Sequence, residues 1–248
     1  MTKKTSNKTR HTCFNGSSSS APIKSLPKDL LVEVVARVAS DSVIDLHNMK
    51  KCCKDFLDAS EDKCVYQQVS LDKFPLSQWF PPNDKTLSFL KHCGQSGNIE
   101  SFYREGLREF FNYPKGNISG LWNLKMATQK GHIEAKYVYG MILLCSQDDD
   151  DLRKQGLEHM RFLRESKCII KCRKKVEQFA KSLWKNNGML VRNEIPLCCC
   201  ESTCKGWSLK KGRWIFLDDD DDAYDADLCE YCRWDHELDY FYQLFGVH

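Results

Sequence analysis

Cysteines gather near the C-terminal end of this 248-residue sequence at spacings typical of metal ligands. Six of the 14 cysteines fall in this region, namely Cys198, Cys199, Cys200, Cys204, Cys229 and Cys232. Thiolates grouped so closely can share one ion, and zinc takes four soft ligands in a tetrahedron. The last pair also precedes a segment with helical apolar spacing, and the amides of a helix N-terminus stabilise thiolate charge. We therefore predict one structural zinc bound by Cys200, Cys204, Cys229 and Cys232.

Two alternatives remain open within this segment. Cys198 or Cys199 can replace Cys200 as a ligand, with His236 as a reserve donor. The competing interpretation is a reduced cysteine-rich tail that binds no metal. A RING with two zinc ions is excluded, because six cysteines and one histidine cannot supply its eight ligands.

The acidic run at residues 218–222 invites a calcium interpretation, which its spacing does not support. An EF-hand loop starting at Asp218 would place Ala223 where a glycine makes the turn, and Cys229 where a bidentate glutamate is needed. We interpret the run as a disordered acidic loop between the two cysteine pairs. The sequence also contains no nucleophile elbow, P-loop, zinc-protease or dinucleotide-binding motif, so we predict a non-catalytic protein.

Charge is nearly balanced overall, at a formal +3, but it is divided into blocks. Residues 153–192 carry 12 basic and three acidic side chains, whereas residues 193–248 carry 13 acidic and five basic ones. The two blocks can therefore neutralise each other within the chain. Nucleic-acid binding is disfavoured, because the cysteine-rich segment is net negative and the basic segment lacks interleaved aromatic residues.

The sequence shows no apolar run of the roughly 18 residues that a membrane span needs, and no signal-peptide centre. We expect a soluble intracellular protein, in the cytoplasm, the nucleus or both. The expected thiols are reduced or metal-bound, and those outside the C-terminal group are interpreted as small buried hydrophobes. Residues 1–21 are basic and polar, which predicts a disordered tail.

Three short helices are predicted in residues 22–72. Leu30, Leu31, Val34, Val35 and Val38 follow helical spacing after Pro27, which suits a first helical turn. A second helix is expected after the polar break at residues 40–42, extending to about residue 59, and a third at about residues 65–71. A module this small has a limited core, so we expect it to dock against another surface.

Helical repeats are predicted behind a proline- and aromatic-rich linker at residues 73–86. In residues 87–192 the chain matches itself at an offset of 34, which pairs Gly97 with Gly131 and Gly106 with Gly140. A period near 34 is typical of helix-turn-helix repeats. Gly97 and Gly131 would end helices in the left-handed conformation, and Gly106 and Gly140 would allow close helix packing. Two unrelated helical hairpins are the alternative.

A third helical pair is expected at residues 151–184, with less regular spacing. Its basic residues lie opposite its apolar stripe, which indicates a solvated basic face. Residues 193–248 form the cysteine-rich tail. The predicted fold class is therefore all-α.

The segment from Leu26 to Phe56 resembles an F-box. The residues that carry the resemblance are Leu26, Pro27, Leu30, Leu31, Val34, Val35, Leu46, Cys53 and Phe56. The repeats are similar to Sel-like repeats, which are related to tetratricopeptide repeats, and plant F-box proteins carry such regions behind the F-box.

The resemblance implies a substrate-receptor subunit of a Skp-cullin-F-box ubiquitin ligase. The nine residues above would bind a Skp-type adaptor and, through it, a cullin. The repeats and the tail would bind the protein to be ubiquitinated. The alternative is a helical-repeat scaffold with a zinc-stabilised tail and no ligase role.

Overall fold

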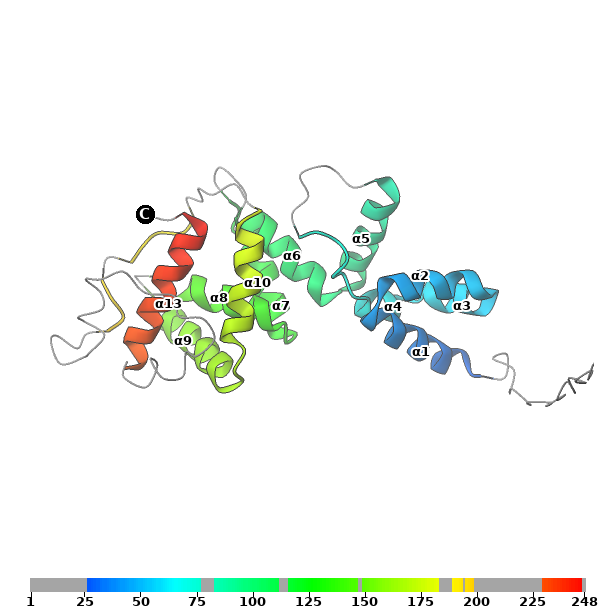
Figure 1. Ribbon diagram of the computed structural model, residues 1–248, viewed down its shortest axis with the longest axis horizontal. Coiled ribbons are helices and arrows are strands. Elements are labelled where there is room, and N and C mark those ends of the chain that lie inside the picture. Colours follow the sequence, from blue (N-terminus) through cyan, green and yellow to red (C-terminus); the bar gives the residue numbers. More distant parts are fainter. Residues whose placement is uncertain are drawn as a thin grey trace, which may run out of the picture.

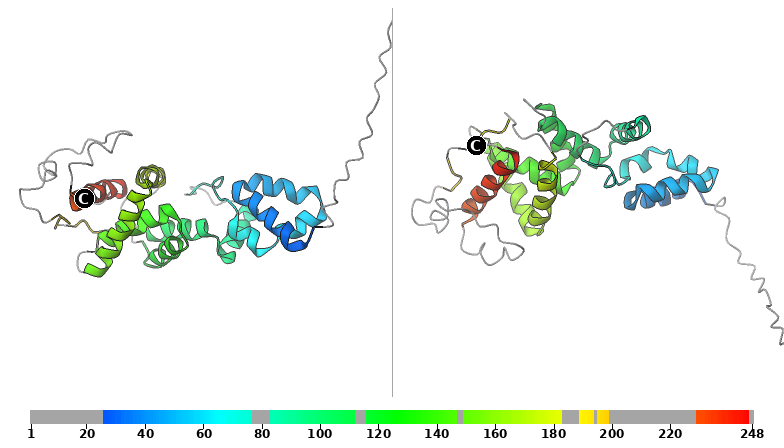
Figure 2. Two further views of the ribbon diagram at one scale, coloured as in Figure 1. Left: turned by 90° about the horizontal axis from the view of Figure 1, so that it is seen from below. Right: turned by 45° about the horizontal axis from the view of Figure 1, so that its top comes forward.

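The computed structural model describes residues 26–76, 83–111, 116–146, 149–182, 189–193, 195–198 and 229–246. Every regular element in these ranges is a helix, which confirms the predicted all-α class. The helices form an elongated arrangement with the N-terminal module at one end and the C-terminal helix at the other (Figures 1 and 2). Two separate hydrophobic clusters form the cores of these two parts. One stabilises the N-terminal module, and the other stabilises the remaining helices.

The N-terminal module contains four helices rather than the three expected: α1 (Lys28–Asp41), α2 (Val43–Cys52), α3 (Lys54–Ser60) and α4 (Lys63–Gln68). Pro27 precedes α1 as its N-cap, and Ser42 caps α2 by accepting a hydrogen bond from the Asp45 amide. The expected long second helix is wrong, because Cys53 is extended and divides it into α2 and α3. The break lets α3 pack back on α1 and bury Ala59.

Two helical hairpins follow, formed by α5 (Asp84–Ser96) with α6 (Ile99–Phe110), and α7 (Ser119–Gln129) with α8 (Ile133–Leu144). α5 begins inside the expected linker. Gly97 and Gly131 have φ of 89° and 91°, a conformation that favours glycine at the end of a helix. The next residue caps the following helix in each hairpin: Asn98 accepts from the Ser101 amide, and His132 accepts from the Ala135 amide. The offset of 34 thus corresponds to a repeated turn.

Glycines bring neighbouring helices of the repeats into close contact. A Cβ atom on Gly106 would lie 2.8 Å from Leu124 Cγ and 2.9 Å from the Gly120 carbonyl oxygen. On Gly140 it would lie 3.1 Å from His159 Cβ, so that crossing is tight but is lined by a side chain. The contacts of α6 with α7, and of α8 with the next helix, α9 (Asp150–Glu165), are therefore made partly by backbone, as small residues permit.

The C-terminal part contains α9 (Asp150–Glu165), α10 (Ile169–Ala180) and α13 (Glu230–Phe245). α13 lies beside α8 and α10 (Figure 1). It buries one apolar stripe in the repeat core, consisting of Trp234, Leu238, Phe241 and Phe245. The helix predicted after the last cysteine pair thus completes the core of the repeats instead of forming a separate unit.

Ion pairs connect the basic block to this acidic helix. Arg161 pairs with Glu230, Arg173 with Glu237, and Arg192 with Asp239. The basic face is partly covered at Arg173, whose side chain is 21% exposed, whereas Arg161 and Arg192 stay 45% exposed and keep contact with solvent. Neutralisation within the chain is what the structure shows.

The cysteines outside the C-terminal group differ in their environments. Cys93 and Cys172 are buried, as expected for small apolar side chains, and burial raises the pKa of each thiol to about 12. Cys52 and Cys53 are exposed, which contradicts the expectation of burial. Both lie at the junction of α2 and α3, where the chain turns at the surface.

Candidate functional site

The N-terminal module exposes a row of apolar side chains at the start of α1. Leu30 and Val34 are four residues apart and lie on one side of the helix, and Leu26 comes just before its first residue. Leu26, Leu30 and Val34 are 41%, 49% and 48% exposed. Ile44 on α2 and Leu57 on α3 are exposed to a similar degree. Large apolar side chains left exposed together on a small module indicate an interaction surface.

The structure divides the nine residues that resemble the F-box motif into two groups. Leu26, Pro27, Leu30, Val34 and Cys53 are exposed, and Phe56 is half-buried. Leu31, Val35 and Leu46 are buried in the module's own core. The expectation that the latter three contact a partner directly is corrected here, because helices α2 to α4 already cover them. They hold the module in the shape that presents the exposed row.

Hydrogen bonds hold the module against the first hairpin. The buried Asn98 side-chain amide donates to the Tyr66 and Val69 carbonyl oxygens, at 3.0 Å each. Arg104 Nη1 donates to the Phe74 carbonyl oxygen at 2.7 Å. Cys93 of α5 lies in the hydrophobic cluster of the module. The N-terminal module therefore packs directly against the first hairpin of the repeats.

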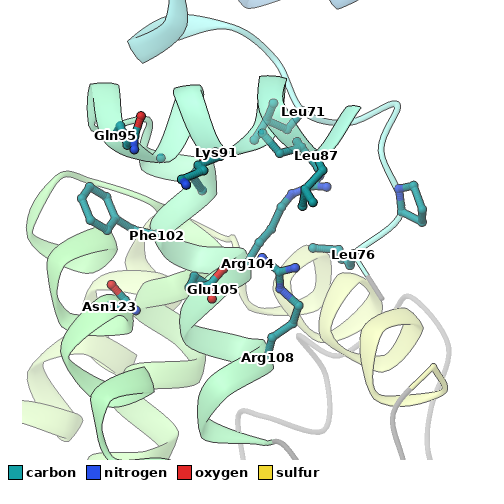
Figure 3. A pocket seen from close by; sticks show the side chains of 14 residues that line it. Leu71, Leu76, Leu87, Lys91, Gln95, Phe102, Arg104, Glu105, Arg108 and Asn123 are labelled. Carbon is teal, nitrogen blue, oxygen red and sulfur yellow. Dashed lines mark hydrogen bonds and ion pairs between the residues drawn. The ribbon is translucent and has the colours of Figure 1, made fainter. Parts of the chain in front are cut away.

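A cavity of about 520 Å³ lies at this junction, between residues 71–76, α5 and α6 (Figure 3). Its apolar wall includes Leu71, Leu76, Leu87, Leu90 and Phe102. Its polar lining includes Lys91, Arg104, Glu105, Arg108 and Asn123. The cavity thus combines an apolar wall with a few fixed polar groups, which is the usual composition of a binding pocket.

A buried polar network lies where the two hairpins meet. His132 Nδ1 accepts from the Ala135 amide, so Nε2 carries the proton and donates to Glu100 at 2.6 Å. Burial raises the pKa of Glu100, but the His132 hydrogen bond and the Arg104 charge outweigh it and leave the pKa below 4.5. Lys175 pairs with Glu134 at 2.5 Å. Sequence reasoning missed this network, although the repeat pairs Glu100 with Glu134 at the offset of 34.

Three cysteines form a cluster at the start of α13. The sulfurs of Cys198, Cys229 and Cys232 all lie within 4.8 Å of one another. The structure therefore brings together Cys229 and Cys232 from the predicted set with Cys198, which was an alternative ligand. Cys200, Cys204 and the acidic run at residues 218–222 lie outside the described residues. His236, the reserve donor, is on α13 but does not belong to the cluster.

Comparison with known proteins agrees with a helical-repeat protein that carries an interaction module at one end. The family model for plant tetratrico peptide repeats matches residues 71–181. Two relatives from Arabidopsis thaliana carry F-box protein names. At1g67623 is 25% identical over 222 residues, which cover 84% of this chain and 72% of the relative. At2g35280 is 32% identical over 126 residues, which cover 50% of this chain and 74% of the relative.

These matches identify both the class and the family of the protein. It is an all-helical protein with repeats similar to plant tetratricopeptide repeats. The chain belongs to the family of plant F-box proteins. No solved structure matches it. Within the described ranges, none of the helices has both the length and the apolar character that crossing a membrane requires.

Proposed function

We propose that this chain is the substrate-receptor subunit of a Skp-cullin-F-box ubiquitin ligase. The observation that carries the proposal is the exposed row of Leu26, Leu30 and Val34 on a module whose own core is already filled. A Skp-type adaptor would cover this row and connect the chain to a cullin. The chain itself would position proteins and transfer nothing.

The energetics of such a contact follow from burial. Each apolar side chain removed from water contributes about 25 cal/mol per Å² of buried area, and truncating central contact residues commonly costs more than 1 kcal/mol each. Leu30 lies in the first turn of α1 and Val34 lies one turn later, and both are about half exposed, so both have area to lose on binding. Cys53 and Phe56 would extend the contact towards α3.

The target protein would bind at the repeats and the C-terminal region. The cavity between α5 and α6 supports this assignment, because it offers apolar wall and fixed charges beside the module. Its position next to the adaptor-binding end would hold a target at a constant distance from the ligase. The hydrogen bonds of Asn98 and Arg104 would keep that distance fixed, because they hold the first hairpin against the N-terminal module.

A titration with a purified plant Skp-type adaptor tests the proposal. The variant combines Leu30→Ala with Val34→Ala, which removes exposed atoms and keeps the core intact. Two losses of about 1 kcal/mol each weaken binding by about 30-fold. Leu87→Ala, an exposed leucine on α5, is the matched control and should bind as the wild type does.

Circular dichroism should show the same helical content for all three proteins. Equal adaptor affinity of the wild type and the double variant would contradict the proposed surface. A wild-type chain that does not bind the adaptor would favour the helical-repeat scaffold without a ligase role.

A further inference from the structure

We propose that Cys198, Cys229 and Cys232 bind one structural zinc ion, which fastens residues 195–198 to the N-terminus of α13. The three thiols come from two segments that are 31 residues apart in the sequence, yet Cys198 Sγ lies 3.5 Å from Cys229 Sγ. Ligands of a tetrahedral zinc with Zn–S bonds of about 2.3 Å are separated by about 3.8 Å. The observed sulfur positions are close to that arrangement.

The backbone around the cluster favours thiolates. Cys229 is the N-cap of α13, and its sulfur accepts a hydrogen bond from the Cys232 amide at 3.3 Å. The positive end of a 16-residue helix therefore faces the sulfurs and stabilises their negative charge. Thiolate is the form that binds zinc.

A carboxylate on α13 holds the segment that carries Cys198 in place. Asp235, one turn into α13, accepts hydrogen bonds from the Leu197 amide at 2.7 Å and the Cys198 amide at 3.1 Å. These bonds fix the irregular chain that carries Cys198 against the helix that carries the other two thiols. Metal sites commonly have supporting contacts of this kind around their ligands.

The cysteine cluster is largely buried, and its thiols lie close to one another. Cys232 is fully buried and Cys198 is 7% exposed, so an ion held there would be shielded from water. Cys93 and Cys172 are also buried, but Cys93 lies in the hydrophobic cluster of the N-terminal module and Cys172 lies in that of the repeats. Among the described residues, only Cys198, Cys229 and Cys232 form a group that could hold a metal. The three thiolates supply three of the four ligands that a structural zinc takes, and a fourth donor completes the tetrahedron.

The site would stabilise the C-terminal end of the repeats. α13 buries Trp234 and Phe241 in the repeat core, and Glu230 in its first turn pairs with Arg161 on α9. A metal bound by Cys229 would fix the N-terminal end of α13, next to the residues that pack into the repeat core. Zinc removal should therefore loosen α13 first and leave the N-terminal module unchanged.

Elemental analysis of the full-length chain, purified under reducing conditions without chelator, tests the site. We expect about one zinc per chain in the wild type, and a loss in Cys198→Ser and in Cys229→Ser with Cys232→Ser. Cys52→Ser with Cys168→Ser removes two thiols outside the cluster and should keep the metal. Deleting residues 218–222 should also keep it, because carboxylates compete poorly with thiolates for zinc.

Cobalt substitution gives a second measurement that does not depend on stability. The wild type should show thiolate-to-cobalt charge-transfer absorption, which weakens in Cys198→Ser while circular dichroism stays helical. Binding should also release protons as the thiols ionise.

The proposal is overturned if the wild type contains no zinc, or if alkylation shows a disulfide between Cys198 and Cys229. Full zinc content in Cys198→Ser, together with loss in Cys200→Ser or Cys204→Ser, would overturn the assignment of Cys198. The adaptor titration is independent of all these results, because its residues lie on α1.

Discussion

Gly106→Ala should destabilise the repeats, although alanine is the better helix former. The new Cβ would lie 2.8 Å from Leu124 Cγ, 2.9 Å from the Leu124 amide nitrogen and 2.9 Å from the Gly120 carbonyl oxygen. Two of these neighbours are backbone atoms of α7, so α6 and α7 must move apart. Overpacking of this kind costs about 3 kcal/mol at the upper end of its usual range.

The helix propensity of alanine offsets part of that cost. Replacing glycine within a helix by alanine contributes about 1 kcal/mol of stability. The net loss is therefore about 2 kcal/mol, which lowers the melting temperature of a chain of this size by about 4–8 °C. Thermal unfolding followed by circular dichroism at 222 nm, a wavelength that reports helix, measures the shift.

Gly94→Ala is the matched control, because it lies in α5 with its nearest neighbour, Ser101 Cβ, at 4.0 Å. It has the propensity gain without the clash and should raise the melting temperature by about 2 °C. Gly140→Ala meets side-chain atoms at 3.1 Å and should fall between the two. A Gly106→Ala protein that melts at or above the wild-type temperature would refute the close α6–α7 crossing.

Two further predictions concern buried carboxylates. Glu237 is 3% exposed and pairs with Arg173, so Glu237→Ala should lower the free energy of unfolding by about 3 kcal/mol, whereas Asp239→Ala at a more exposed pair should cost less than about 1 kcal/mol. Equal losses in urea denaturation would contradict this. The pKa of Glu100 is below 4.5 in the folded chain, so its contribution is present above about pH 4.5 and is lost as the pH falls through the folded pKa. Glu100→Gln should therefore lose less stability than the wild type as the pH falls below about 4.5, and parallel pH profiles would show that another group is responsible.

Local sequence patterns were sufficient to predict the repeated elements of the fold. The offset of 34 located the turns at Gly97 and Gly131, because a left-handed residue at a helix end favours glycine wherever it occurs. The apolar spacing after Cys232 located α13 for a similar reason, since helical periodicity is a property of neighbouring residues. Each of these features depends on residues that are close along the chain.

Local patterns were not sufficient to predict the members of the cysteine cluster or of the proposed adaptor surface. Spacing favoured Cys200, which lies outside the described residues. The structure places Cys198 beside Cys229, where Asp235 accepts hydrogen bonds from the Leu197 and Cys198 amides. That contact spans 37 residues and leaves no signal in the spacing of the cysteines.

On α1, the packing of the neighbouring helices sets which apolar residues remain available for a partner. Leu30 and Leu31 are adjacent in the sequence and belong to the same helical stripe, yet Leu30 is 49% exposed and Leu31 is 6% exposed. The apolar stripe of a helix is wide, so one edge can face the core while the other faces a partner. Periodicity alone therefore cannot show which apolar residues are buried. The separation comes from how the neighbouring helices pack: α2, α3 and α4 bury Leu31 and Val35 and leave Leu30 and Val34 exposed.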